Sequence, residues 1–407
     1  MLAAISEGTS IVKNLSDGED VHSTRRALEQ LGVQIKSLDS EKISVHGHRG
    51  NFFPTSHAVD CGNSGTTMRL LAGLLAAQSF SSRLVGDASL SQRPMKRIIT
   101  PLCQMRALID AEGINDRPPL IIGGNSQLSS LQNYTLPIAS AQLKSSLLLA
   151  SLFAKGTTNI IEPISTRDHT ERLFELFQLS FNETKIGSAK KISLTGPQIP
   201  QACNVKIPGD ISSAAFWILA AAARPESCLK IKNIGLNPTR TGFLHVLRRM
   251  GANIKMNQGT DSSAEPFGEI IIHGSSLVGT IMEGKEIPGL IDELPILAIA
   301  GALAKGTTII RNAQELRVKE TDRITALVHN FRAMGVSVVE YPDGLEIKGG
   351  SCFQGTALKS FGDHRIAMAF SIASLFAEGE STIDNATCIA TSYPSFAAEL
   401  QNLVSNK

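Results

Sequence analysis

The strongest constraint on the fold is a unit that repeats along the chain. An apolar helix rich in Ala and Leu runs toward a glycine and then a Thr-rich strand in LAAISEGTSIVKN, SLFAKGTTNIIE, GALAKGTTIIRN and SLFAEGESTIDN. The glycines of these copies are Gly8, Gly156, Gly306 and Gly379. Two degenerate copies, near Ser79 and Pro225, complete a series of six units with a spacing of about 74 residues.

A second signature supports this period. LGVQIK at Leu31, MGANIK at Met250 and MGVSVV at Met334 each predict the end of a second helix and the start of a strand. We expect the glycines that follow the helices to act as C-caps. A unit of this size cannot close a core alone, which favours an α/β protein of two similar domains, 1–206 and 207–407, with three units each. Accidental similarity among ordinary α/β segments is the alternative, and the agreement of two signatures disfavours it.

Composition excludes several classes of protein. Lys and Arg total 39 against 37 Asp and Glu, so a net charge of +2 gives no reason to expect nucleic acid or an anionic membrane as partner. The 6 cysteines are widely spaced without a CxxC pair, which disfavours disulfides and zinc and favours a reducing cytoplasm. We also expect no targeting signal and no membrane span.

Small and polar residues precede the apolar helices. They occur in GNSGTTMR, SAQLKSS, PGDISSAAF, IDELPIL and GDHRIAM. Such residues suit N-caps. For PGDISSAAF we favour capping alone, because Asp210 and Ser212 suffice as caps and no cation accompanies them in the sequence.

Cations and amide donors accompany the other helix starts, where free N–H groups favour anions. At the first helices these are Arg69, Gln142 with Lys144, and His364 with Arg365. At the second helices they are Arg93, Arg167, Arg240 and Lys319. A single such Arg is usually a solvated surface residue, but the recurrence favours a shared function. We expect the charges of both domains to converge on one cleft between the domains that binds a multiply charged anion.

Glu320, within VKETDR, has two interpretations. It lies between Lys319 and Arg323 and could be a helical ion-pair partner. It could equally be a carboxyl group tuned for proton transfer. The residues alone leave both open.

In this order GNSGTTMRLL, GDASLSQRPM, SAQLKS, STRDHTER, PGDISSAAF, ELRVKETDR and GDHRIAM resemble the 5-enolpyruvylshikimate-3-phosphate synthase family. TRDHTE, LNPTRTG and IATSYP look like its class II branch. The resemblance implies an inside-out α/β barrel fold with three βαβαββ units per domain and an active site between the domains. It also implies a monomer that transfers the enolpyruvyl group of phosphoenolpyruvate to the 5-hydroxyl of shikimate 3-phosphate, without metal or cofactor.

The resemblance carries over to individual residues. It implies shikimate 3-phosphate ligands at Ser140, Ala141, Gln142, Arg167, Asp292 and Lys319. It implies phosphoenolpyruvate ligands at Asn63, Gly65, Arg93, Gln142, Arg323 and Arg365. Asp292 would be the base for the attacking hydroxyl, and Glu320, with Lys319, would serve protonation of the methylene carbon.

The chain departs from the family at its start. The family usually begins with a segment like PGDKSISHRA, whereas this chain starts at Met1, where the family helix continues. The missing segment would supply a lysine, a serine and an arginine for the substrates, together with one strand. Alternatives are therefore an impaired or inactive truncated enzyme, or a non-catalytic binding protein. UDP-N-acetylglucosamine enolpyruvyl transferase is disfavoured, because Ala88 stands where its reactive cysteine would fall.

Overall fold

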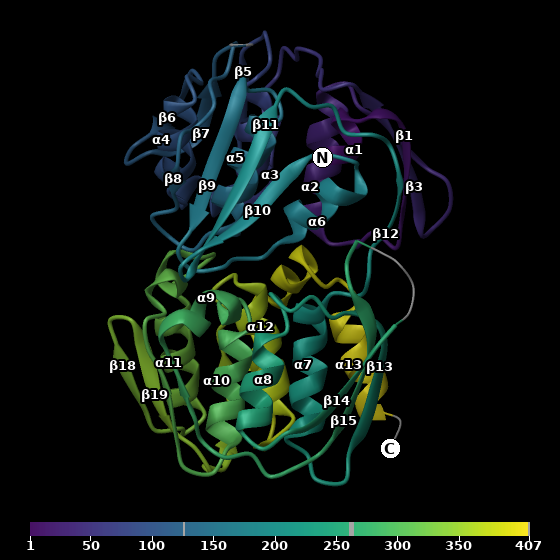
Figure 1. The fold of residues 1–407 in the computed structure, drawn as a ribbon. Helices are drawn as coiled ribbons and strands as arrows, with labels where there is room; N and C mark the ends of the chain where they lie inside the picture. The colour runs from purple at the N-terminus through teal and green to yellow at the C-terminus, as the bar shows by residue number, and fades with distance from the viewer. Residues whose placement is uncertain (125–126, 260–263, 406–407) are drawn as a thin grey trace. The chain divides into compact units, whose positions relative to one another are not determined.

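The computed structural model describes residues 1–124, 127–259 and 264–405. The chain divides into two compact units, Met1–Ile207 (unit 1) and Pro208–Lys407 (unit 2), each with its own apolar core. The boundary predicted from the sequence lies one residue earlier. Figure 1 shows the elements of both units. Among the described residues, no helix is both long enough and apolar enough to cross a membrane.

The described part of unit 1 contains three 4-stranded sheets with one shared topology. The first has the order β12-β1-β3-β2, with β1 (Glu7–Lys13), β2 (Gln34–Ser37), β3 (Lys42–His48) and β12 (Asn204–Lys206). The second has the order β4-β5-β7-β6, with β4 (Val59–Asp60), β5 (Ser82–Val85), β6 (Ile109–Gly113) and β7 (Arg117–Ile122). The third has the order β10-β11-β9-β8, with β8 (Tyr134–Thr135), β9 (Gly156–Glu162), β10 (Phe181–Ile186) and β11 (Ala189–Gly196).

Each of these sheets combines one parallel pair with antiparallel neighbours. The parallel pairs are β12 with β1, β4 with β5, and β8 with β9. The helices of unit 1 are α1 (Leu2–Ile5), α2 (Glu19–Gln30), α3 (Gly65–Leu75), η1 (Leu90–Gln92), α4 (Lys96–Gln104), α5 (Ala141–Ser151) and α6 (His169–Leu176). A helix joins the two parallel strands and a second helix leads to the antiparallel pair, so the second and third sheets show the βαβαββ order.

Unit 2 repeats this plan less regularly, with one 3-stranded sheet, one 4-stranded sheet and two 2-stranded pairs among its described residues. One sheet is β13-β15-β14, with β13 (Cys228–Gly235), β14 (Asn253–Gln258) and β15 (Phe267–His273). The next is β16-β17-β19-β18, with β16 (Ile281–Met282), β17 (Thr307–Ile310), β18 (Val338–Tyr341) and β19 (Gly344–Lys348). The last strands form the parallel pairs β20 (Phe353–Gln354) with β22 (Ala377–Glu378), and β21 (Ala357–Leu358) with β23 (Thr382–Ile383).

Helices form the centre of unit 2 and strands lie outside them (Figure 1). The α-helices are α7 (Ile211–Ala222), α8 (Gly242–Arg249), α9 (Ile287–Leu290), α10 (Leu294–Leu303), α11 (Arg323–Ala333), α12 (His364–Ser374) and α13 (Phe396–Ser405). The 3₁₀ turns are η2 (Gly284–Glu286), η3 (Gln314–Val318) and η4 (Ala386–Thr391). The apolar helices α7, α10 and α12 pack against one another. This is the inside-out arrangement that the resemblance implies.

The two repeat signatures have different structural roles. Leu31 and Met250 are C-caps of second helices, as predicted, and the glycine after each has a positive φ. The glycines of the first signature do not cap their helices, which corrects the expectation. Gly156, at φ +98°, begins β9, and Gly306, at φ +91°, directly precedes β17. The chain needs the left-handed conformation where it enters these strands, and glycine adopts it without strain.

Candidate active site

In unit 1, Asn63 and Gly65 lie at the start of α3. Ser64 between them caps the helix, because its Oγ accepts a hydrogen bond from the Thr67 N–H at 3.2 Å. Asn63 Oδ1 accepts from Arg93 Nη2 at 2.7 Å, and Asn63 Nδ2 donates to an Asp87 carboxylate oxygen at 2.7 Å. The side chain of Asn63 therefore holds Arg93 at this loop.

Gly65 leaves space for two guanidinium groups. A Cβ at this position would lie 2.9 Å from Arg69 Nη1 and 3.2 Å from Arg93 Nη1. Both arginines are 8% exposed. Their charges therefore meet at the N-terminus of α3, whose free N–H groups also favour an anion.

Gln142 connects the starts of α5 and α3. Ala141 is the first residue of α5, and Ser140 caps this helix by accepting from the Leu143 N–H at 3.3 Å. Gln142 Oε1 accepts from Arg69 Nη1 at 2.7 Å, and its Nε2 donates to Thr66 Oγ1 at 2.8 Å. Gln142 thus links the starts of the two helices through Arg69 and Thr66.

Lys144 does not bind an anion at the helix start, which corrects the prediction for this residue. Its side chain is 0% exposed and lies 2.6 Å from a Glu171 carboxylate oxygen and 3.1 Å from a Glu162 oxygen. Glu162 also accepts from the backbone N–H of Thr166, at 3.3 Å, and from its hydroxyl, at 2.6 Å. Arg167 follows Thr166 and is half-buried. Lys144 points into the unit and stabilises the loop that carries Arg167.

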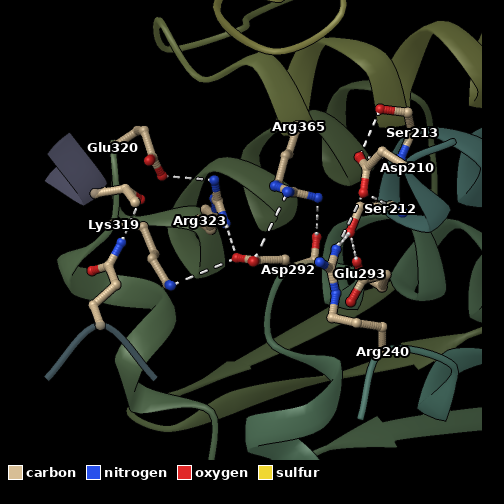
Figure 2. A network of polar contacts seen from close by, with 12 residues as sticks. Asp210, Ser212, Ser213, Arg240, Asp292, Glu293, Lys319, Glu320, Arg323 and Arg365 are labelled. Carbon is tan, nitrogen blue, oxygen red and sulfur yellow. Dashed lines mark hydrogen bonds and ion pairs between the residues drawn. The ribbon is translucent and has the colours of Figure 1, made fainter. Parts of the chain in front are cut away.

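In unit 2, Asp292 lies among three of the predicted cations, in the turn between α9 and α10 (Figure 2). Its carboxylate is 3.6 Å from Lys319 Nζ, 3.7 Å from Arg323 Nη1 and 3.9 Å from Arg365 Nη2. Arg365 Nη1 also donates to the carbonyl oxygen of Asp292 at 3.0 Å. The carboxylate and the carbonyl oxygen of Asp292 therefore both contact cations from other elements.

Arg323 is buried among carboxylates. Its Nε and Nη2 donate to the two oxygens of Asp363 at 2.7 and 3.3 Å, and Nη2 also donates to Glu320 at 2.7 Å. Burial lowers the pKa of Arg323, but the charges of Asp363, Glu320 and Asp292 outweigh it and raise the pKa above its ordinary value. Within the described ranges, Nη1 is buried without a hydrogen-bond partner and lies 3.7 Å from the Asp292 carboxylate.

The ion-pair interpretation of Glu320 is confirmed by its contact with Arg323, while its role in proton transfer stays a prediction. His364 is a further correction. It was expected to add positive charge at the start of α12, but burial and the charge of Arg365 lower its pKa to about 4. His364 is therefore neutral near pH 7, and Arg365 provides the charge of this helix start.

A cation does accompany Asp210 and Ser212, contrary to the prediction for PGDISSAAF. Asp210 caps α7 by accepting from the N–H groups of Ser212 and Ser213, at 3.2 and 3.0 Å. Ser212 does not cap with its side chain; its hydroxyl donates to Glu293 and accepts from Arg240. Arg240 Nη2 also lies 3.4 Å from Asp210.

The sequence could not reveal this network, because its bonds join residues 28 and 81 positions apart. The one signal was a second acidic residue, Glu293, directly after Asp292 in IDELPIL. The residues of the two networks belong to two units that are described separately, so the cleft expected between the domains stays a prediction.

Comparisons with known proteins agree on one family. A family model for EPSP synthase (3-phosphoshikimate 1-carboxyvinyltransferase) matches residues 1–400. A 3-phosphoshikimate 1-carboxyvinyltransferase of Akkermansia muciniphila is 47% identical, with 98% of this chain and 93% of the relative covered. One of Synechococcus sp. is 45% identical, with 99% and 90% covered.

Solved structures show the same relationship. An EPSP synthase from Acinetobacter baumannii matches with a TM-score of 0.84 at 42% identity, and the match covers 99% of this chain and 91% of that one. The enolpyruvyl transferase NikO from Streptomyces tendae matches with a TM-score of 0.76 at 18% identity, covering 99% and 91%. This second match supports the fold alone.

Proposed function

The chain belongs to the EPSP synthase family, and we propose how its charged residues serve that family's reaction. It is a 3-phosphoshikimate 1-carboxyvinyltransferase of the shikimate pathway, which leads to aromatic amino acids. The enzyme transfers the enolpyruvyl group of phosphoenolpyruvate to the 5-hydroxyl of shikimate 3-phosphate and releases phosphate. Both substrates are small polyanions, which suits the arginines and the lysine of the two networks.

We assign phosphoenolpyruvate to Asn63, Gly65, Arg93, Gln142, Arg323 and Arg365. The space above Gly65 supports this assignment, because a Cβ there would meet the guanidiniums of Arg69 and Arg93. In unit 2, Arg323 Nη1 also supports this assignment, because the atom has no hydrogen-bond partner among the described residues. Guanidinium groups match phosphate and carboxylate oxygens in pairs, so arginine suits this substrate better than lysine.

We assign shikimate 3-phosphate to Ser140, Ala141, Gln142, Arg167, Asp292 and Lys319. Ser140 Oγ accepts the bond from Leu143, which leaves the hydroxyl hydrogen for a phosphate oxygen. The hydroxyl of Thr166 donates a hydrogen bond to Glu162, and this bond limits the motion of the adjacent Arg167. The assignment thus uses residues whose backbone the fold already holds.

In the proposed mechanism Asp292 and Glu320 handle the protons. Asp292 accepts the proton of the 5-hydroxyl of shikimate 3-phosphate while the hydroxyl oxygen bonds to C2 of phosphoenolpyruvate. Glu320, with Lys319, supplies a proton to the methylene carbon, which gives a tetrahedral intermediate. Glu320 then takes a proton back from the new methyl group, the C–O bond to phosphate breaks, and the double bond returns. The proton held by Asp292 leaves with the phosphate, so both carboxylates return to their starting states.

The cations around these carboxylates also link substrate binding to proton transfer. Lys319, Arg323 and Arg365 lie within ion-pair distance of the Asp292 carboxylate. Arg323 also donates to Glu320, at 2.7 Å. Anionic substrates that bind these cations therefore contact the same side chains that surround the two carboxylates.

The other interpretations lose support or stay predictions. The family match and the names of the relatives favour the shikimate enzyme over UDP-N-acetylglucosamine enolpyruvyl transferase. A cytoplasmic location is supported by free cysteines throughout the described residues, because a reducing compartment keeps thiols free. The monomeric state stays a prediction.

One observation carries the assignment of residues: the carboxylate of Asp292 lies within ion-pair distance of Lys319, Arg323 and Arg365. The test is phosphate release by the purified 407-residue chain, which we expect only when phosphoenolpyruvate and shikimate 3-phosphate are both present. UDP-N-acetylglucosamine in place of shikimate 3-phosphate should give no release. Shikimate 3-phosphate binding without turnover would instead favour the impaired form of the enzyme.

A further inference from the structure

A buried carboxylate next to Asp292 has no role in the mechanism above. Glu293 is 1% exposed, and in the described part of the chain its Oε2 atom has no hydrogen-bond partner. It directly precedes α10, but the described residues include no capping bond from its side chain. A buried carboxylate costs several kcal/mol unless it is paired, and an apolar residue would cost less at the start of this apolar helix. Stability alone therefore does not explain Glu293.

Glu293 is connected to a cation through a serine (Figure 2). The Ser212 hydroxyl donates its single hydrogen to Glu293 Oε1, and its oxygen accepts from Arg240 Nη2. The two bonds therefore run in one direction, from the guanidinium through the hydroxyl to the carboxylate. Arg240, at 14% side-chain exposure, compensates the charge of Glu293 through this hydroxyl and also lies 3.4 Å from Asp210.

Both ends of this chain are anchored in the fold. Ser212 is in the first turn of α7, and Asp210 already caps that helix, so the Ser212 hydroxyl is available for Glu293. The loop before α8 holds Arg240, whose N–H donates to the carbonyl of Asn237 at 2.8 Å. Asn237 Oδ1 in turn accepts from the Thr239 N–H at 2.9 Å.

We propose that Arg240, Ser212 and Glu293 are positioning residues that hold the backbone from which the Asp292 carboxylate projects. The inference rests on the proposed role of Asp292 as the base. The Glu293 N–H donates to the carbonyl of Leu290 at 2.8 Å, which closes the turn that contains Asp292.

Arg365 holds the carbonyl of Asp292 on one side of this turn, and the Ser212 bond holds Glu293 on the other. The backbone of Asp292 is thus held directly by Arg365 and, through the side chain of the next residue, by Ser212. A base must lie within hydrogen-bond distance of the proton it removes, and small displacements of such groups slow a reaction strongly.

The test compares two neighbouring serines of α7. Ser212→Ala removes the link between Arg240 and Glu293, whereas Ser213→Ala removes only a hydroxyl bonded to Asp210 at 2.8 Å. We expect Ser212→Ala to lower kcat at least about tenfold, with KM for both substrates within about twofold. Ser213→Ala should keep both constants within about twofold of the unmodified chain.

Ser212→Thr, which restores the hydroxyl, should recover most of the lost kcat. Equal kcat in the Ser212 and Ser213 variants, or an effect of Ser212→Ala on KM alone, would overturn the positioning role. If Ser212→Ala does not fold, Glu293→Gln decides, because it keeps the side-chain shape; an unchanged kcat in that variant would overturn the inference. Turnover by the unmodified chain is measured in parallel, and its absence would reject the proposed function instead.

Discussion

Cations at the helix starts have different partners in the two units. In unit 1 Arg69 and Arg93 donate to amide oxygens, those of Gln142 and Asn63. In unit 2 Arg323 donates to the carboxylates of Asp363 and Glu320 and lies near that of Asp292. An amide oxygen orients a guanidinium but carries no net charge. A carboxylate neutralises the cation and can itself take part in proton transfer.

Unit 1 also contains a cation among carboxylates, but this cation is buried inside the unit. Lys144 is fully buried against Glu162 and Glu171, and its contacts stabilise the loop before α6. The same interaction therefore has a structural role in unit 1, whereas at Asp292 in unit 2 it forms the candidate catalytic centre. The location of a carboxylate relative to the helix starts separates the two roles.

The largest expected effect is on kcat, and it differs between a carboxylate of unit 2 and one of unit 1. Asp292→Asn should lower kcat by roughly 10³-fold, because the amide cannot accept the hydroxyl proton, while shikimate 3-phosphate still binds. Asp87→Asn in unit 1, whose carboxylate accepts from Asn63, should change kcat no more than a few-fold. Steady-state kinetics and calorimetric binding measure both. Comparable losses of kcat in the two variants would contradict the division of roles.

The second prediction compares arginines. Arg323→Gln should raise KM for phosphoenolpyruvate and lower the free energy of unfolding by roughly 3 to 5 kcal/mol, because carboxylates are left without their buried cation.

Arg93→Gln should raise the same KM but cost only about 1 to 2 kcal/mol, since it gives up bonds to an amide and a hydroxyl. Denaturant unfolding and initial rates separate the two outcomes. Equal losses in the free energy of unfolding would contradict the inference that carboxylate partners make an arginine costlier to remove than amide partners.

The third prediction concerns pH and His364. Its pKa is lowered to about 4 in the folded chain, from an unfolded value of about 6.5. Between these values the unfolded state binds the proton and the folded state does not, so the free energy of unfolding falls as the pH is lowered from about 6.5 to about 4. The loss is at most about 3 kcal/mol, and His364→Asn should lack this part of the pH dependence. Parallel pH dependences in both proteins would show that His364 is not held neutral.

Repetition in the sequence was enough to predict six units and helix-strand order, because apolar periodicity and glycine positions are local. Capping at Ser140 and at Asp210 also followed from local residues. The partner and the protonation state of individual charged residues did not follow from local residues. Lys144 and His364 stand at helix starts like the other cations, but one is paired with buried carboxylates and the other is neutral.

The sequence by itself determined the family, the repeat and which residues stand at the helix starts, since motifs and periodicity are properties of neighbouring residues. Only the tertiary structure decided which partner each charge has, because residues such as Ser212 and Glu293 are brought together by the packing of α7 against α10. The energy of a charge depends on its burial and on atoms within a few ångströms, and neither is written in the local sequence.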